Sequence, residues 1–247
     1  MQETKSKKLG VIGGLGPLAT AYFYELVTEF TKIRTEQDHL EIILYSRPSI
    51  PDRTAYILDR SKPSPLPGII TAGKDLCAIG AEVIALPCVT AHYFYNDYEG
   101  EIPAEVIHMP RETAAELKSA GVKTAGIMAT DGTVHSGVLE TALREQGISA
   151  VLPSPERQAD VMELIYGCVK AGKPLDMEKF FTVANELRQK GAEVIILGCT
   201  ELSLFKRREI GPGFIDVLEV LAKRSIERCG GTVREEYLDL LRARGRS

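Results

Sequence analysis

Two cysteines occupy matching places in a repeated passage of the chain, and their thiols are the groups best suited to proton transfer. The passages Gly80–Cys88 and Gly191–Cys199 agree at seven of nine positions and lie 111 residues apart. Each passage predicts a buried strand that ends two residues before its cysteine, with a helix to follow. Partial positive charge at a helix N-terminus stabilises thiolate. Cys88 and Cys199 are therefore the candidate acid and base.

The repeat also organises the rest of the chain. A second, weaker internal similarity aligns Leu9–Ile12 with Ala125–Met128, at an offset of 116 residues. We therefore expect two related halves, one built from residues 1–117 with 211–247 returning to it, and the other from 118–210. Ligands bind beyond the carboxyl ends of parallel strands. Two halves that face each other would present both thiols to one cleft.

Short β-branched runs alternate with amphipathic stretches along the chain, which predicts an α/β fold with two pseudo-symmetric halves, each a mostly parallel sheet flanked by helices. The expected strands are Lys8–Gly13, Leu40–Tyr45, Glu82–Leu86, Glu105–Met109, Lys123–Met128 and Glu193–Leu197. The expected helices are Pro17–Arg34, Gly68–Ile79, Arg111–Ser119, Val134–Gln146, Glu156–Ala171 and Asp176–Lys190. The proline-rich segment Tyr45–Gly68 is expected to lie over a pocket, because long loops in compact domains are often functional.

Composition excludes several classes of protein. The 247 residues are 44% hydrophobic and 26% charged, with a net charge of -4, so no basic field gathers nucleic acid or anionic lipid. The longest apolar runs fall short of a membrane span. Scattered histidines and unpaired cysteines predict neither a metal site nor disulfides. We expect a cytoplasmic protein with a small-molecule partner, in which Cys77, Cys168 and Cys229 are structural.

Five motifs resemble the aspartate/glutamate racemases that work without pyridoxal phosphate, and the resemblance covers nearly the whole chain. The motifs are Gly13–Thr20, Ile50–Thr54, Pro87–His92, Lys170–Gly172 and Gly198–Leu202. In that family, two cysteines flank the substrate α-carbon and exchange protons on opposite faces. The resemblance implies an amino-acid racemase in which Cys88 and Cys199 are catalytic, no cofactor or metal is needed, and the protein is a homodimer.

The resemblance also implies how the substrate is bound. Arg53 and Lys170 match the cationic positions of the family, and a guanidinium suits a carboxylate geometrically. Four threonines match hydroxyls around the α-carboxylate, although a threonine at a helix start is equally an N-cap. These are Thr90, Thr130, Thr133 and Thr200. The loop at Gly14 is expected to turn backbone N–H groups toward a carboxylate.

Two positions depart from the family pattern and bear on the substrate. Val89 stands where the family usually has an asparagine whose amide contacts the amino acid. Arg47 adds a cation where polar uncharged residues are common, and we include it among the candidate carboxylate ligands. His92 follows the first cysteine closely, but a histidine satisfied by a neighbouring group is the favoured interpretation.

Two other functions fit the residues. Gly14–Ala19 matches the dinucleotide fingerprint, and Arg47 follows the second strand, where a 2′-phosphate would lie, so an NADP-dependent oxidoreductase is one alternative. That alternative leaves the repeated cysteines unexplained. The other is a catalytically silent protein that binds an amino acid or dicarboxylate in the same cleft, an alternative that Val89 keeps open.

Overall fold

The computed structural model describes residues 6–205 and 207–241. Its strands form two four-stranded sheets in which every pairing of neighbouring strands is parallel. The first sheet has the order β2-β1-β3-β4, with β1 at Leu9–Gly13, β2 at Ile42–Ser46, β3 at Val83–Ala85 and β4 at Glu105–Val106. The second has the order β6-β5-β7-β8, with β5 at Thr124–Met128, β6 at Ser149–Val151, β7 at Val194–Leu197 and β8 at Phe214–Asp216. The predicted α/β fold with two mostly parallel sheets is confirmed.

The internal repeat has a direct structural counterpart. The two repeated passages contain β3 and β7, which take the third place in their sheets, while β1 and β5 take the second. The burial of β1, β3 and β7 on both faces explains why they are continuous apolar runs rather than alternating ones. The order of strands is therefore the same in both halves.

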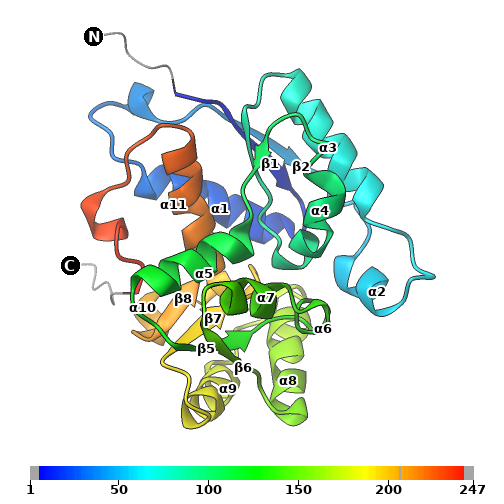
Figure 1. Cartoon of the computed structure of the whole chain (residues 1–247), viewed down its shortest axis with the longest axis vertical. Coiled ribbons are helices and arrows are strands. Elements are labelled where there is room, and N and C mark those ends of the chain that lie inside the picture. The colour runs from blue at the N-terminus through cyan, green and yellow to red at the C-terminus, as the bar shows by residue number, and fades with distance from the viewer. Residues whose placement is uncertain (1–5, 206, 242–247) are drawn as a thin grey trace.

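Helices cover the sheets and join the halves (Figure 1). The helices of the first half and the junction are α1 at Pro17–Phe30, α2 at Arg53–Leu58, α3 at Leu66–Ala78, α4 at Tyr95–Tyr98 and α5 at Met109–Ser119. Those that follow are α6 at Asp131–Ser136, α7 at Val138–Glu145, α8 at Pro155–Met162, α9 at Met177–Gln189, α10 at Arg207–Ile210 and α11 at Val217–Arg228. Proline at the first position starts α1, and side-chain caps from Asp176 and Asp216 start α9 and α11.

Three predicted elements take a different form. The helix expected over 134–146 is divided at Gly137, whose φ of 64° is the left-handed conformation that glycine tolerates. The helix expected over 156–171 changes after Met162 into a π-helix, Glu163–Val169. The proline-rich segment 45–68 contains a short helix, α2, because Asp52 caps it through the Ala55 N–H at 2.7 Å.

The strands β6 and β8 were not among the expected strands, and β8 bears on where the halves divide. It lies beyond residue 210, where we expected the second half to end, and it pairs with β7. The helix α11 follows β8 immediately, and Figure 1 shows it beside α1 and α5. We therefore propose that the second half runs to Asp216 and that the return to the first half begins with α11.

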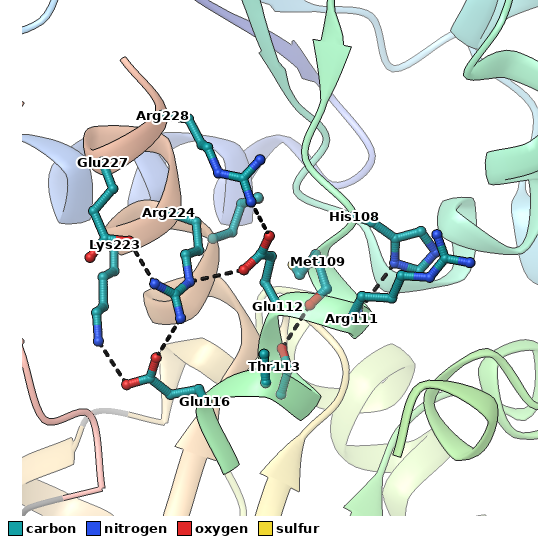
Figure 2. Close-up of polar contacts among 12 residues, drawn as sticks. His108, Met109, Arg111, Glu112, Thr113, Glu116, Lys223, Arg224, Glu227 and Arg228 are labelled. Carbon is teal, nitrogen blue, oxygen red and sulfur yellow. Dashed lines mark hydrogen bonds and ion pairs between the residues drawn. The ribbon is translucent and has the colours of Figure 1, made fainter. Parts of the chain in front are cut away.

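The two halves share a hydrophobic core rather than folding as separate bodies. One cluster of buried residues includes Leu9 and Val83 of the first sheet, Ile127 of the second, and Val220 of α11. Ion pairs reinforce the same junction: Glu112 and Glu116 of α5 face Lys223, Arg224 and Arg228 of α11 (Figure 2). Within residues 6–205 and 207–241, no helix is long and apolar enough to cross a membrane.

Candidate active site

Cys88 and Cys199 lie in the wall of one narrow cleft between the halves. Cys88 follows β3 and precedes a 3-10 helix, η2, at Val89–Phe94. Cys199 follows β7 in the corresponding place. Their residues are 6% and 7% exposed, so both thiols are nearly removed from bulk water. The cleft also has α2 and the π-helix on its sides, through Arg53 and Tyr166.

Glu201 controls the environment of Cys199. The Cys199 thiol donates a hydrogen bond to Glu201 Oε2 at 2.9 Å, and Thr200 Oγ1 donates to the same oxygen at 3.4 Å. Burial, and then the negative charge of Glu201, raise the pKa of Cys199 well above its ordinary value. Cys199 is therefore a protonated thiol at neutral pH, ready to deliver a proton.

Arg53 is the cation beside Cys88. It is a buried residue of the first turn of α2, and its guanidinium donates to the carbonyl oxygens of Leu15 at 2.8 Å and Pro51 at 3.0 Å. Burial opposes its charge, but negative charge at Cys88, Asp52 and Glu201 outweighs burial and leaves the pKa of Arg53 raised. Its buried Nε has no hydrogen-bond partner among the described residues. Arg53 therefore places a permanent positive charge beside the Cys88 sulfur and retains a donor for a ligand.

Lys170 brings a second cation to the cleft from the end of the π-helix. Its Nζ lies 3.9 Å from Glu201 Oε1 and 4.1 Å from the centroid of the Tyr166 ring. Burial opposes its charge, but Glu201 and Tyr166 more than compensate, so the pKa of Lys170 is raised and its ammonium stays charged. A π-helix is rare and often occurs at functional sites. Here it places Tyr166 and Lys170 in the same wall.

Three of the predicted threonines form a closed triangle of hydroxyl groups. Thr90 Oγ1 lies 3.2 Å from Thr130 Oγ1 and 2.9 Å from Thr133 Oγ1, and the last two are 3.1 Å apart. Thr130 also caps α6 by accepting from the Thr133 N–H at 3.3 Å. Thr90, Thr130 and Thr200 line the cleft, whereas Thr133 contacts it through its hydroxyl partners.

The structure does not bring every candidate to the cleft. Val89 lines it, but Gly14 and Arg47 are absent from its wall and lie against each other. Gly14 has a φ of 86°, and a Cβ there would be 2.5 Å from the Arg47 backbone nitrogen. His92 is fully buried and bonded to the Leu86 carbonyl at 3.2 Å and the Tyr98 hydroxyl at 3.2 Å, which agrees with the satisfied histidine that we expected.

Sequence reasoning missed five residues of the wall, which are Leu15, Asp52, Thr54, Tyr166 and Glu201. Glu201 belongs to the motif Gly198–Leu202, and its position two residues after Cys199 is the signal that could have identified it. Tyr166 had no such signal, because a tyrosine in an amphipathic helix is typical of packing. Within the described parts of the chain, no three histidine, cysteine or acidic residues gather as metal ligands.

Comparison with known proteins places this geometry in a family. The model of the Asp/Glu/Hydantoin racemase family matches residues 12–224. The chain is 25% identical to the broad specificity amino-acid racemase RacX of Bacillus subtilis over 201 residues, which are 79% of this chain and 86% of RacX.

Solved structures agree with that match. The aspartate racemase of Picrophilus torridus has a TM-score of 0.84 and 32% identity, with 94% of this chain and 97% of that one covered. An aspartate racemase homologue from Pyrococcus horikoshii has a TM-score of 0.74 and 26% identity, with 91% and 99% covered. With two thiols at corresponding strand ends and a family model that spans most of its length, this chain belongs to the Asp/Glu/Hydantoin racemase family.

Proposed function

We propose that this protein is a cofactor-independent amino-acid racemase in which Cys88 and Cys199 transfer protons on opposite faces of the substrate α-carbon. One observation carries the proposal. Two buried thiols from corresponding strands line the same cleft, with Arg53 beside one and Glu201 hydrogen-bonded to the other. Stereoinversion needs a base on one face of the α-carbon and an acid on the other. The different surroundings of the two thiols suit one to each role.

The proton inventory follows from these surroundings. In one direction, the Cys88 thiolate removes the α-proton and becomes a thiol, while the bond electrons remain on the substrate as a carbanion. Cys199 then gives its proton to the opposite face of that carbon and becomes a thiolate. Lys170, near Glu201, offsets the negative charge that then accumulates beside Cys199. The reverse direction uses the same two groups with their roles exchanged.

An amino acid with a second carboxylate is the substrate that the cleft favours. Arg53 and Lys170 are two cations in a small buried space, which suits two carboxylates of one molecule. Thr90 and Thr130 line the cleft, and a hydroxyl that leaves its bond within the triangle can donate to a carboxylate oxygen. Such donors stabilise the charge that develops when the α-proton leaves. Val89 contributes no hydrogen bond, so recognition depends on these cations and hydroxyls. Aspartate and glutamate are the first substrates to test.

The dinucleotide alternative is disfavoured by Glu201. A Cβ added at Gly16, the residue before α1, would lie 2.9 Å from Glu201 Oε1. A carboxylate therefore occupies the N-terminus of the helix where a pyrophosphate would need to bind, and like charges repel. We also propose that the reaction needs no metal or pyridoxal cofactor, since two thiols provide acid and base. Activity should survive dialysis against a chelator.

The decisive experiment is an NMR survey of amino acids incubated with the protein in deuterated water. We expect α-proton exchange together with inversion, and loss of inversion in Cys88→Ser and in Cys199→Ser. Each variant is expected to retain exchange with one enantiomer only, because each thiol serves one face. Cys77→Ser is the matched control, since Cys77 lies outside the cleft. Inversion at the wild-type rate in both cleft variants would refute the proposal, and binding without exchange would favour the silent binding protein.

For assembly and location, we propose a homodimer in the cytoplasm. The edge strand β2 exposes Leu44 and Tyr45, and α1 exposes Leu18 and Tyr24. Large apolar side chains that are exposed on a sheet edge and on a helix are features of protein interfaces. Light scattering should give twice the mass of the chain, and a monomer at micromolar concentration would contradict the dimer.

A further inference from the structure

A second hollow lies at the junction of the two halves, away from the cysteines. It is open to solvent, has a volume of about 250 Å³, and shares no lining residue with the cleft. Its walls come from η2, α4 and α5 on one side and from α6 and α7 on the other. Three rings form an aromatic floor: the Tyr95 and His108 centroids are 4.4 Å apart, and those of His92 and His108 are 5.3 Å apart.

Two opposite charges stand across this hollow. Arg111 of α5 and Glu145 of α7 are joined at 3.7 Å, and their side chains are 53% and 48% exposed. The Arg111 guanidinium also lies 5.7 Å from the centroid of Tyr95. An exposed pair at this separation contributes little to stability, so a ligand can part it at small cost. Each charge would then be available to an opposite charge of the ligand.

His108 adds a donor beside the cation, and Figure 2 shows it next to Arg111 at the start of α5. Its Nδ1 accepts from the Arg111 backbone N–H at 3.2 Å. Burial, and then the charge of Arg111, lower the pKa of His108 to about 4, so the ring is neutral at pH 7. A neutral ring that accepts through Nδ1 carries its proton on Nε2.

We propose that this hollow binds a free aromatic amino acid. Its α-carboxylate would pair with Arg111 and its α-ammonium with Glu145, while its ring packs on the floor of Tyr95 and His108. A ligand with only one charge would part the ion pair and leave either Arg111 or Glu145 without a partner. The hollow therefore selects a zwitterion, and the site is independent of the chemistry at Cys88 and Cys199.

The composition of the chain provides a direct probe. The protein contains no tryptophan, so the emission of added tryptophan, excited where tyrosine does not absorb, reports only the ligand. We expect saturable changes in emission and anisotropy with free tryptophan. Tryptamine lacks the carboxylate and indole-3-propionate lacks the ammonium, and each should bind at least about tenfold more weakly, because a hydrogen bond to a charged group is lost.

Matched variants locate the site. Arg111→Gln and Glu145→Gln should each weaken tryptophan binding by about tenfold or more. Lys118→Gln on α5 and Glu140→Gln on α7 remove the same charges outside the hollow and should leave binding unchanged. Arg53→Gln, in the catalytic cleft, should also bind normally, so failure of the proposed racemase activity would not affect this measurement.

Three results would overturn the proposal. The first is the absence of any saturable signal with tryptophan, and the second is binding that survives both Arg111→Gln and Glu145→Gln. The third is binding lost in Arg53→Gln, which would place tryptophan in the cleft instead. Light scattering at the assay concentration completes the test, because a fall in mass in Arg111→Gln or Glu145→Gln would assign the hollow to contact with a second copy of the chain.

Discussion

At the scale of single residues, the cleft is asymmetric although the chain repeats. Cys88 has the guanidinium of Arg53 as its neighbour, whereas the Cys199 thiol donates a hydrogen bond to the carboxylate of Glu201. The repeated strands place the two sulfur atoms, but the residues around them differ between the halves: Arg53 of α2 lies beside Cys88, and Glu201 stands two residues after Cys199, where the first half has Thr90. The chemical difference between the two thiols therefore arises where the repeat is not exact.

Replacing Glu201 tests this asymmetry. Glu201→Gln keeps the shape but removes the negative charge that helps to raise the pKa of Cys199. We expect the limb of the pH–rate profile that belongs to Cys199 to move to lower pH. We also expect kcat to fall by about ten- to a hundredfold in the direction that uses Cys199 as the acid, through loss of a charged hydrogen bond. The profile is measured by circular dichroism for each enantiomer. A fall in kcat without any displacement of the profile would mean that Glu201 acts only on packing.

Val89 offers a second residue-scale test. Val89→Asn adds an amide to the wall of the cleft, next to Cys88 and Thr90. We expect kcat/KM for aspartate or glutamate to rise by about ten- to a hundredfold, because a hydrogen bond to a charged group contributes about 1.5–3 kcal/mol. Val83→Thr in the buried strand β3 controls for a polar substitution near the site that cannot reach the substrate. Efficient wild-type turnover that Val89→Asn leaves unchanged would show that valine is neutral here.

At the scale of elements, ion pairs between α5 and α11 hold α11, the helix with which the chain returns to the first half, in place. The ammonium of Lys223 is 2.7 Å from Glu116 Oε1 and 2.6 Å from the Leu238 carbonyl, and both ionic side chains are nearly buried. Arg224 binds Glu116 and Glu112 from the same helix, each at 3.0 Å (Figure 2). Removing one partner of a buried ion pair is strongly destabilising, whereas replacing both partners with apolar residues of similar volume is often neutral.

This network predicts a non-additive pair of variants. Glu116→Leu removes the counter-charge at 2.7 Å from the buried Lys223 ammonium, so the free energy of unfolding should fall by about 3–5 kcal/mol. Adding Lys223→Met removes that buried charge, and the double variant should recover at least half of the loss. Urea denaturation measures both. Equal losses in the single and double variants would show that the stability comes from packing of α11 rather than from its charges.

At the scale of the whole molecule, buried histidines tie stability to pH. Burial, and then the positive charge of His108, lower the pKa of His92 to about 3, and burial with Arg111 lowers that of His108 to about 4. Unfolding returns each ring to an ordinary pKa near 6.5, so below that pH the unfolded chain binds protons that the folded chain does not. Stability is therefore fully present above pH 6.5 and declines as the pH falls.

The size of this effect can be measured between pH 6.5 and 5, above the range in which most carboxyl groups titrate. Each histidine should remove about 2 kcal/mol from the free energy of unfolding over that interval, since one pKa unit corresponds to about 1.4 kcal/mol. His92→Asn should halve the decline found by urea denaturation at each pH, while His39→Gln, outside this pair, should not alter it. If the free energy of unfolding of His92→Asn falls with pH as steeply as that of the wild type, His92 does not cause the decline.

Local patterns in the sequence were enough for the fold class, because buried parallel strands are short β-branched runs and amphipathic helices repeat their apolar residues on one face. The repeat also identified the two strands that the cysteines follow. Strands β6 and β8, of three residues each, escaped prediction. The equally short β3 lies within a longer apolar run, whereas Gly147 and Pro153 flank β6 and Gly213 precedes β8, which is typical of loops. The predicted helix is divided at Gly137 because this glycine adopts a left-handed backbone conformation, and a single glycine in a helical pattern is not enough to predict that conformation.

The tertiary structure alone decided which side chains meet. It turned Glu201 onto Cys199, closed three threonines into a triangle, and left Arg47 out of the cleft wall. These contacts join residues that are 40 or more positions apart, or depend on side-chain direction, and neither periodicity nor composition carries that information. The sequence by itself determined that two thiols end equivalent strands. Only the packing of the two halves determined what surrounds each thiol, because burial and neighbouring charge are properties of the folded chain.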